Sequence, residues 1–260
     1  MLEVLTIPTY IILGIASFFA GLLNALAGGG TFFTLPALLY VGLPPVSANA
    51  TNASVLLPGY LGTVFGLRNS LDSINKRQLA ILMSIVVVGA IIGSYALINT
   101  SDKLFRELAP FLILLATFLF ISGPRITKFK ESASKNSFLE RVGVFAVSGY
   151  GGYFNGGLGI ALMAIFSMSG NQNLKQMLAL KSLFSLLLTS ISVIAFSLAE
   201  LIHWPLALGM MFFSVLGGYS GSYIARKVSS QKLNILIVFV GLSVSVLLFI
   251  NLKSNNALFF

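Results

Sequence analysis

The chain has 260 residues, of which 57% are hydrophobic and only 9% are charged, and its mean hydropathy is +0.94. A soluble domain carries about 25% charged residues, so this composition excludes a water-soluble domain and predicts an integral membrane protein. The net charge of +9 comes from basic residues in short loops between apolar runs, which is typical of membrane topology signals and argues against nucleic-acid binding. The chain has no cysteine and a single histidine, His203, so thiolate sites and histidine clusters are excluded.

Six segments have the length of about 20 apolar residues that a spanning helix needs. In chain order they are Val46–Leu67, Gln78–Ile98, Leu104–Ser122, Leu174–Ala199, Trp204–Ala225 and Leu233–Leu252. Two longer apolar regions, Pro8–Val41 and Val142–Met168, contain clusters of glycine. No signal peptide is evident, and we expect the first apolar segment to remain in the protein.

The polar stretch 124–141 predicts a cytoplasmic linker between a first membrane repeat, residues 1–123, and a second, residues 142–260. The two halves resemble each other. The sequence GAIIGSYAL starts at Gly89, and GGYSGSYIA starts 128 residues later at Gly217. The same offset places Gly28-Gly29 over Gly156-Gly157. Internal duplication of this kind is the usual construction of secondary transporters.

The basic residues distinguish two arrangements of these repeats. If each glycine-containing region crosses the membrane once, the repeats are parallel, and nine basic residues lie inside against six outside. If each region returns to the side from which it entered, the second repeat is inverted, and twelve lie inside against three outside, with Lys181 within a helix. The positive-inside rule favours the inverted arrangement, in which both termini lie outside the cytoplasm.

In the inverted arrangement, the glycine clusters become the tips of two re-entrant hairpins that meet near the midplane. Three consecutive glycines cost roughly 3 kcal/mol of helix stability relative to alanine, and non-helical backbone at this depth is tolerated only inside protein or beside a wet cavity. The free amides of broken helices attract anions. Gly28, Gly29, Gly30, Gly156 and Gly157 are therefore candidate substrate-binding residues. Close helix packing is the alternative role for these glycines.

Uncharged hydrogen-bonding side chains gather around both tips. Thr31 follows the first tip, Asn155 lies at the second, and the segment SANATNAS supplies Asn49, Thr51 and Asn52. Asn49 and Asn52 are three residues apart, so they share one face of a helix. Substrate binding and hydrogen bonding between helices both remain open for each of these residues.

Lys181 is the charged residue predicted to lie deepest in the membrane, about 10 Å along the helix from Lys175. No carboxylate is predicted in the membrane core, so an anionic ligand is its expected partner. Snorkelling of the ammonium toward the cytoplasmic surface is the alternative. We find no catalytic residue set, metal-ligand cluster or nucleotide motif, so we expect neither an enzyme nor a cofactor.

The segment GLLNALAGGGTFFTLPALLYVGLPPVSANATN, which starts at Gly21, resembles the sulfite exporter TauE/SafE family of membrane transporters. Its echo GYFNGGLGIALMAIF, starting at Gly152, and the two GSY repeats also fit, and the resemblance covers about residues 8 to 252. The resemblance implies a carrier of sulfite, an organosulfonate or another sulfur-containing oxyanion. The second copy departs from the family pattern, because Leu158 stands where a third glycine is common and no proline stands at Ala164.

Together these features predict an all-α polytopic protein of the inner cell membrane, with two inverted repeats that each comprise a glycine-tipped re-entrant hairpin and three transmembrane helices. The expected function is secondary transport of a small anion by alternating access. A passive anion channel and a non-transporting membrane scaffold are the alternatives. The expected partners are the anion and the lipid bilayer, without nucleic acid, and a homodimer is left open.

Overall fold

The computed structural model describes residues 7–26, 28–67, 74–128, 137–169, 174–224 and 230–254, which contain ten helices and short connections. In chain order the helices are α1 (Ile7–Leu26), α2 (Thr31–Tyr40), α3 (Pro45–Leu67), α4 (Lys76–Ile98), α5 (Asp102–Lys128), α6 (Ser137–Tyr153), α7 (Leu158–Met168), α8 (Leu174–Leu198), α9 (Trp204–Ile224) and α10 (Ser230–Ser254). The protein is therefore all-helical in its described part, as predicted.

Each of the six segments predicted to span the membrane forms a helix, namely α3, α4, α5, α8, α9 and α10. Within the described residues, four stretches are long and apolar enough to cross a bilayer. They are Ile7–Asn24, Lys76–Ile98, Asp102–Ser122 and Gln176–Leu198. The helices α5 and α6 extend into both ends of the predicted linker, of which residues 129–136 lie outside the described part.

The chain breaks its helical path at both glycine clusters. After α1, Gly28 adopts a φ of +84°, and its N–H donates to the Leu23 carbonyl at 3.1 Å. Before α7, Gly157 adopts a φ of +73°. Both values lie in the left-handed region that glycine enters without the steric cost of a Cβ atom. The two clusters therefore end one helix and allow the next to start in a new direction.

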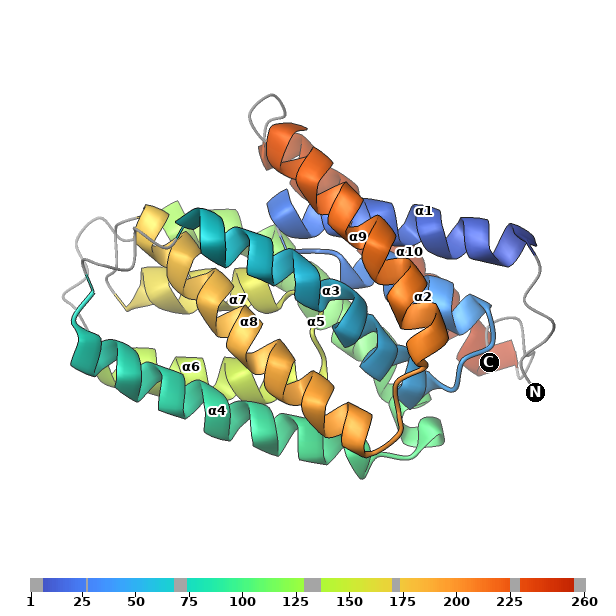
Figure 1. Ribbon diagram of the computed structural model, residues 1–260, viewed down its shortest axis with the longest axis horizontal. Coiled ribbons are helices and arrows are strands. Elements are labelled where there is room, and N and C mark those ends of the chain that lie inside the picture. Colours follow the sequence, from blue (N-terminus) through green and yellow to red (C-terminus); the bar gives the residue numbers. More distant parts are fainter. Residues whose placement is uncertain are drawn as a thin grey trace.

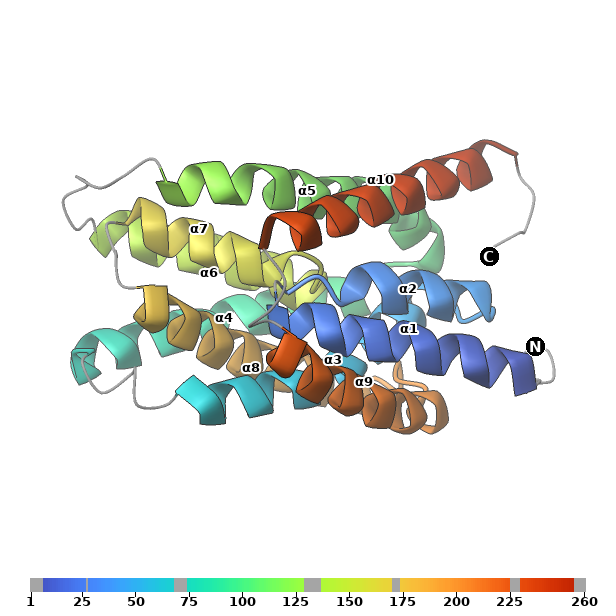
Figure 2. The same ribbon diagram turned by 90° about the horizontal axis from the view of Figure 1, so that it is seen from above.

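Helices from the two halves of the chain pack against one another. α1 packs along α9, α4 packs along α6, α3 packs on α8, and α5 packs on α10. In addition, α2 packs on α1 and α7 packs on α6. Figure 2 shows α1 and α2 in the half of the molecule nearer the N label, and α7 in the opposite half, so that both breaks lie in the middle.

Two of the helix crossings bring backbone against backbone at glycine. On α9, a Cβ atom at Gly217 would collide with the carbonyl oxygen of Phe18 on α1. On α4, a Cβ atom at Gly93 would collide with the carbonyl oxygen of Gly149 on α6. The repeated glycine-containing motifs at Gly89 and Gly217 thus form the surfaces on which α4 and α9 approach their partners, as small residues do between membrane helices.

Three chain segments are joined at one end of the molecule. The first turn of α3 is held by the Asp102 carboxylate at the start of α5, which accepts from the Val46 N–H at 2.9 Å. The Ser47 hydroxyl donates to the carbonyl of Leu201, between α8 and α9, at 2.6 Å. Figure 1 shows the α4–α5 and α8–α9 connections at this same end.

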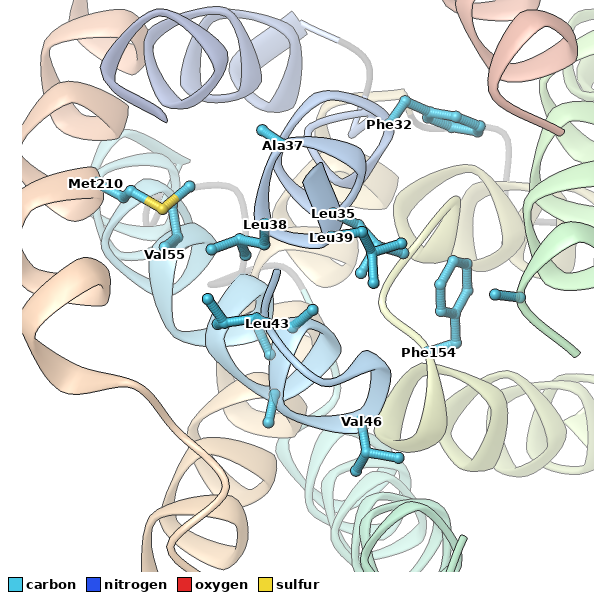
Figure 3. Close-up of a cluster of buried hydrophobic side chains, with 14 of the residues drawn as sticks. Phe32, Leu35, Ala37, Leu38, Leu39, Leu43, Val46, Val55, Phe154 and Met210 are labelled. Atoms are coloured by element: carbon cyan, nitrogen blue, oxygen red, sulfur yellow. The ribbon is translucent and has the colours of Figure 1, made fainter. Parts of the chain in front are cut away.

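The largest hydrophobic cluster lies around α2, with side chains from α1, α3, α5 and α9. Figure 3 shows Leu35, Leu38 and Leu39 of α2 within it, with Phe154 from the second break nearby. A second cluster joins α4, α6, α7 and α8. Large apolar side chains also cover the outer surface: Tyr95, Phe111, Phe118, Leu208 and Phe212 are each more than half exposed. Apolar side chains on the outside as well as the inside are those of a protein surrounded by lipid.

Candidate functional site

The two breaks in the helical path meet at the side chain of Lys181. A Cβ atom placed on Gly28 would lie 3.5 Å from the Cα atom of Gly159 and 3.7 Å from the Lys181 ammonium nitrogen. A Cβ atom on Gly159 would lie 2.6 Å from the Lys181 Cε atom and 3.2 Å from Nζ. The lysine on α8 therefore reaches into the place where α1–α2 and α6–α7 come together, and the two glycines leave the room for it.

Lys181 is buried, with 7% of its surface exposed. Within the part of the chain that the structure describes, its ammonium makes no hydrogen bond and no ion pair. Three of the described carboxylates are exposed, on Asp102, Glu107 and Glu200. The buried carboxylate, on Glu140, accepts from the Gln78 side chain at 2.8 Å. A buried ammonium without an anion is costly, so the observed arrangement is one that a bound anion would stabilise.

The start of α7 lies beside Lys181 and adds to the positive charge there. The residue before α7, Gly157, and the residue before α2, Gly30, make no side-chain capping hydrogen bond. At the start of α7, Ile160 and Ala161 donate to the Gly157 carbonyl, while the Gly159 N–H makes no backbone hydrogen bond within the described residues. This unbonded Gly159 amide together with the helix dipole at the start of α7 forms a local anion-binding environment.

Asn155 is the centre of a buried hydrogen-bond chain that joins the halves of the protein. The Tyr60 hydroxyl of α3 donates to Asn155 Oδ1 at 2.9 Å. Asn155 Nδ2 in turn donates to Thr189 Oγ1 of α8 at 2.9 Å. The Oδ1 atom of Asn24, on α1 just before the first break, is buried without a hydrogen-bond partner. This chain fixes the second break between α3 and α8, two turns along α8 from Lys181.

Asn52 fixes the first break to α3. Its Oδ1 accepts from the Thr34 hydroxyl, and its Nδ2 donates to Thr31 Oγ1 at 3.3 Å. Thr31 and Asn52, both predicted as substrate ligands, thus bond to each other and hold α2 against α3. All three side chains are buried.

Asn49 and Thr51 make their hydrogen bonds elsewhere. Asn49 Nδ2 donates to the Tyr153 carbonyl at the end of α6, at 2.8 Å. The Thr51 hydroxyl oxygen accepts from the His203 N–H, before α9, at 3.0 Å. These two bonds tie α3 to the second half of the protein, and neither includes Lys181.

The remaining predicted glycines are buried in the two breaks. The carbonyls of Gly29 and Gly30 accept hydrogen bonds from the first turn of α2. The carbonyl of Gly156 accepts from the Tyr150 hydroxyl at 2.6 Å, and Gly157 packs against Ala116 of α5. These glycines shape the breaks, whereas Gly28 faces Lys181 directly.

Gly159 was not among the predicted site residues, although it makes the closest approach to Lys181. The sequence signal was present, because Gly159 is the third glycine of the segment GGLG. The 128-residue offset pairs Gly28 with Gly156, however, whereas in the structure Gly159 lies against both Gly28 and Lys181. Among the described residues, no group of histidine, aspartate and glutamate side chains is arranged to hold a metal ion.

Comparison with known proteins gives one family. A model of the family described as sulfite exporter TauE/SafE matches residues 13–248. A protein of Haemophilus influenzae named "Probable membrane transporter protein" is 29% identical over 81% of this chain and 83% of its own length. The Escherichia coli K12 protein named "Probable membrane transporter protein YfcA" is 24% identical over 85% of this chain and 82% of its own length. A Sinorhizobium protein, "Probable membrane transporter protein ORF9", is 27% identical over 89% of each chain. No solved structure matches the chain.

Proposed function

Because the chain belongs to the sulfite exporter TauE/SafE family of multi-pass membrane transporters, which are not enzymes, we propose that it carries a small anion across the inner membrane by alternating access. The observation that carries this proposal is the buried Lys181 ammonium between Gly28 and Gly159, which has no partner among the described residues. A charged side chain inside a membrane protein marks a functional site by default. Because the Lys181 ammonium is positively charged, the ligand that it would bind is an anion.

Two inverted repeats are the second part of the proposal. In this proposal the five helices α1 to α5 of the first repeat correspond, in order, to the five helices α6 to α10 of the second repeat. The contact of α1 with α9 then matches that of α6 with α4, and the contact of α3 with α9 matches that of α8 with α4. The packing of α2 on α3 matches that of α7 on α8 in the same way. These helix contacts are therefore the same when the two halves of the chain are exchanged. Two related units that are joined by a pseudo-twofold axis have this property.

The hydrogen bonds at the helix ends support inversion over a parallel arrangement. In the inverted arrangement, the start of α3, the start of α5 and the α8–α9 connection all lie outside the cytoplasm. Val46 bonds to Asp102 and Ser47 bonds to Leu201, so these three segments are neighbours. Parallel repeats would put Leu201 on the opposite side of the membrane from Ser47. Both glycine breaks then belong to re-entrant hairpins, one from each side, and both termini are extracytoplasmic.

A sulfur-containing oxyanion is the proposed substrate, and sulfite is the first to test. The family description names sulfite, and the site offers two kinds of donor for oxygen atoms: the Lys181 ammonium and the Gly159 N–H at the start of α7, which is unbonded among the described residues. Of the predicted ligands, Gly28 lies against the ammonium, while Thr31, Asn52 and Asn155 hold the two breaks in place by hydrogen bonds.

The test is uptake of sulfite by proteoliposomes that contain the native protein or the Lys181→Gln variant. The proposal predicts saturable native uptake that the variant loses, with both proteins eluting as the same monodisperse species in detergent. Sulfite flux that rises linearly with concentration would indicate a channel instead. Native uptake that is unchanged in Lys181→Gln would remove Lys181 from the site.

Topology has its own test, since the native chain lacks cysteine. Single cysteines are placed by Ser101→Cys, Ala199→Cys and Ser137→Cys, and intact cells are treated with a membrane-impermeant maleimide. The inverted arrangement predicts labelling at positions 101 and 199 but not at 137. Protection at position 199 together with labelling at 101 would contradict inversion.

A further inference from the structure

Polar side chains form a buried stripe along one side of α8. Lys181, Ser185 and Thr189 follow one another at intervals of four residues, with exposed fractions of 7%, 0% and 0%. Residues four apart are neighbours on one helix face. The stripe therefore begins at the ammonium of the proposed site and ends at Thr189, which accepts from Asn155.

Both ends of this stripe contact the same segment of chain. Lys181 lies against Gly159 at the start of α7, and Thr189 binds Asn155 at the beginning of the second break. The stripe on α8 therefore runs alongside the second break. Ser185 lies between Lys181 and Thr189 in rotation and in height along α8. Ser185 therefore lies on the face of α8 that meets the second break.

The hydroxyl group of Ser185 is buried and has no hydrogen-bond partner. Serine hydroxyls in membrane helices commonly donate back to the carbonyl four residues earlier. Ser182, on the same helix, does so and donates to the Leu178 carbonyl at 2.8 Å. Ser185 makes no such bond, which leaves its donor available one helical turn from a positive charge.

Other buried serines without a partner have a different setting. Ser214 of α9 lies at the crossing with α1, where its carbonyl meets Gly21. Ser148 of α6 lies at the crossing with α4, against Gly89. Small residues at such crossings serve close packing. Ser245, the fourth such serine among the described residues, lies on α10, so Ser185 alone of the four is on the same helix as Lys181.

We propose that the Ser185 hydroxyl is a second side-chain ligand of the transported anion, donating to one oxygen while the Lys181 ammonium binds another. This inference rests on the proposed function and adds a residue to its site. Residues 181 and 185 are four apart, about 6 Å of rise along α8, so their side chains suit two oxygens of one oxyanion. A hydroxyl donor to a charged oxygen selects for oxyanions whose oxygens project in more than one direction.

The test measures sulfite uptake in proteoliposomes as a function of concentration for Ser185→Ala and two matched controls. Ser182→Ala removes a neighbouring buried hydroxyl that is already bonded, and Ser214→Ala removes an unpartnered hydroxyl at the crossing of α9 with α1. Loss of one hydrogen bond to a charged group is expected to raise the KM of Ser185→Ala by about tenfold or more. Maximal uptake should stay within about twofold of native, and both controls should keep the native KM.

A second readout does not depend on transport. Sulfite should raise the Tm of the native protein and both controls in detergent, and Ser185→Ala should need about tenfold more sulfite for the same rise. A KM and a sulfite dependence equal to those of the controls would overturn the assignment of Ser185, even with uptake lost in Lys181→Gln. Absence of saturable native uptake, or native behaviour of Lys181→Gln, would overturn the proposed function and this inference with it.

Discussion

Replacing Gly159 with alanine should impair anion binding while leaving the fold intact. The new methyl group would lie 2.6 Å from the Lys181 Cε atom, whereas carbon atoms in contact prefer about 3.5–4.0 Å. The end of the lysine side chain must therefore move by about 1 Å. Since this end is flexible, the movement costs little stability, and alanine in the first turn of α7 gains up to about 1 kcal/mol of helix propensity.

The size of the effect on binding follows from Coulomb's law. With an effective dielectric constant of about 20, an anion about 3 Å from the ammonium is held by about 5.5 kcal/mol, and one about 4 Å away by about 4.2 kcal/mol. The difference of about 1.4 kcal/mol corresponds to roughly a tenfold loss of affinity. We therefore expect the KM of Gly159→Ala for sulfite to rise about tenfold.

The assay pairs concentration-dependent uptake with thermal melting in detergent. Gly209→Ala is the matched control, because Gly209 is exposed on α9 with no atom near its Cβ position. The expected result is a raised KM and a native or higher Tm for Gly159→Ala, with a native KM for Gly209→Ala. A native KM in Gly159→Ala would refute the contact between the lysine and the start of α7 as the location of the anion.

Three further substitutions test the packing and the site by their Tm in anion-free detergent. Gly217→Ala forces a methyl group into the backbone of α1 and should lower the Tm by roughly 5–10 °C. The control Gly209→Ala should keep the native Tm. Equal Tm values for the two variants would contradict the close crossing of α1 and α9. Lys181→Met removes a buried unpaired charge and should raise the Tm by roughly 5 °C or more; a lower Tm would mean that the ammonium has a stabilising partner. Asn155→Ala leaves the buried Tyr60 hydroxyl without its acceptor and should lower stability by about 1–3 kcal/mol, and an unchanged Tm would remove this bond from the network.

The helices were predictable because a bilayer fixes the length of the segments that cross it. The predicted segment Val46–Leu67 corresponds to α3 (Pro45–Leu67), and Leu174–Ala199 corresponds to α8 (Leu174–Leu198). The break at Gly28 was also predictable from composition, since consecutive glycines disfavour a helix. The burial of Lys181 followed from its position in an apolar run and is now visible as a 7% exposed side chain.

Contacts between distant segments could not be predicted from the sequence pattern. The bond between Thr51 and the His203 N–H joins residues 152 positions apart, and no local periodicity indicates it. The contact of Gly28 with Gly159 rather than Gly156 depends on how the breaks turn in space. Ser185 carries no signal in the sequence, since serine is common in membrane helices. Its unbonded hydroxyl became evident only with the hydrogen bonds of α8 in view.

The central claim is that the Lys181 ammonium binds the transported anion, and direct binding tests it without reconstitution. Purified native protein and the Lys181→Gln variant are equilibrated in detergent with radiolabelled sulfite, and the bound ligand is measured over a range of concentrations. The account predicts one saturable site per native chain and no saturable binding to the variant. Saturable binding of native affinity in Lys181→Gln would contradict it.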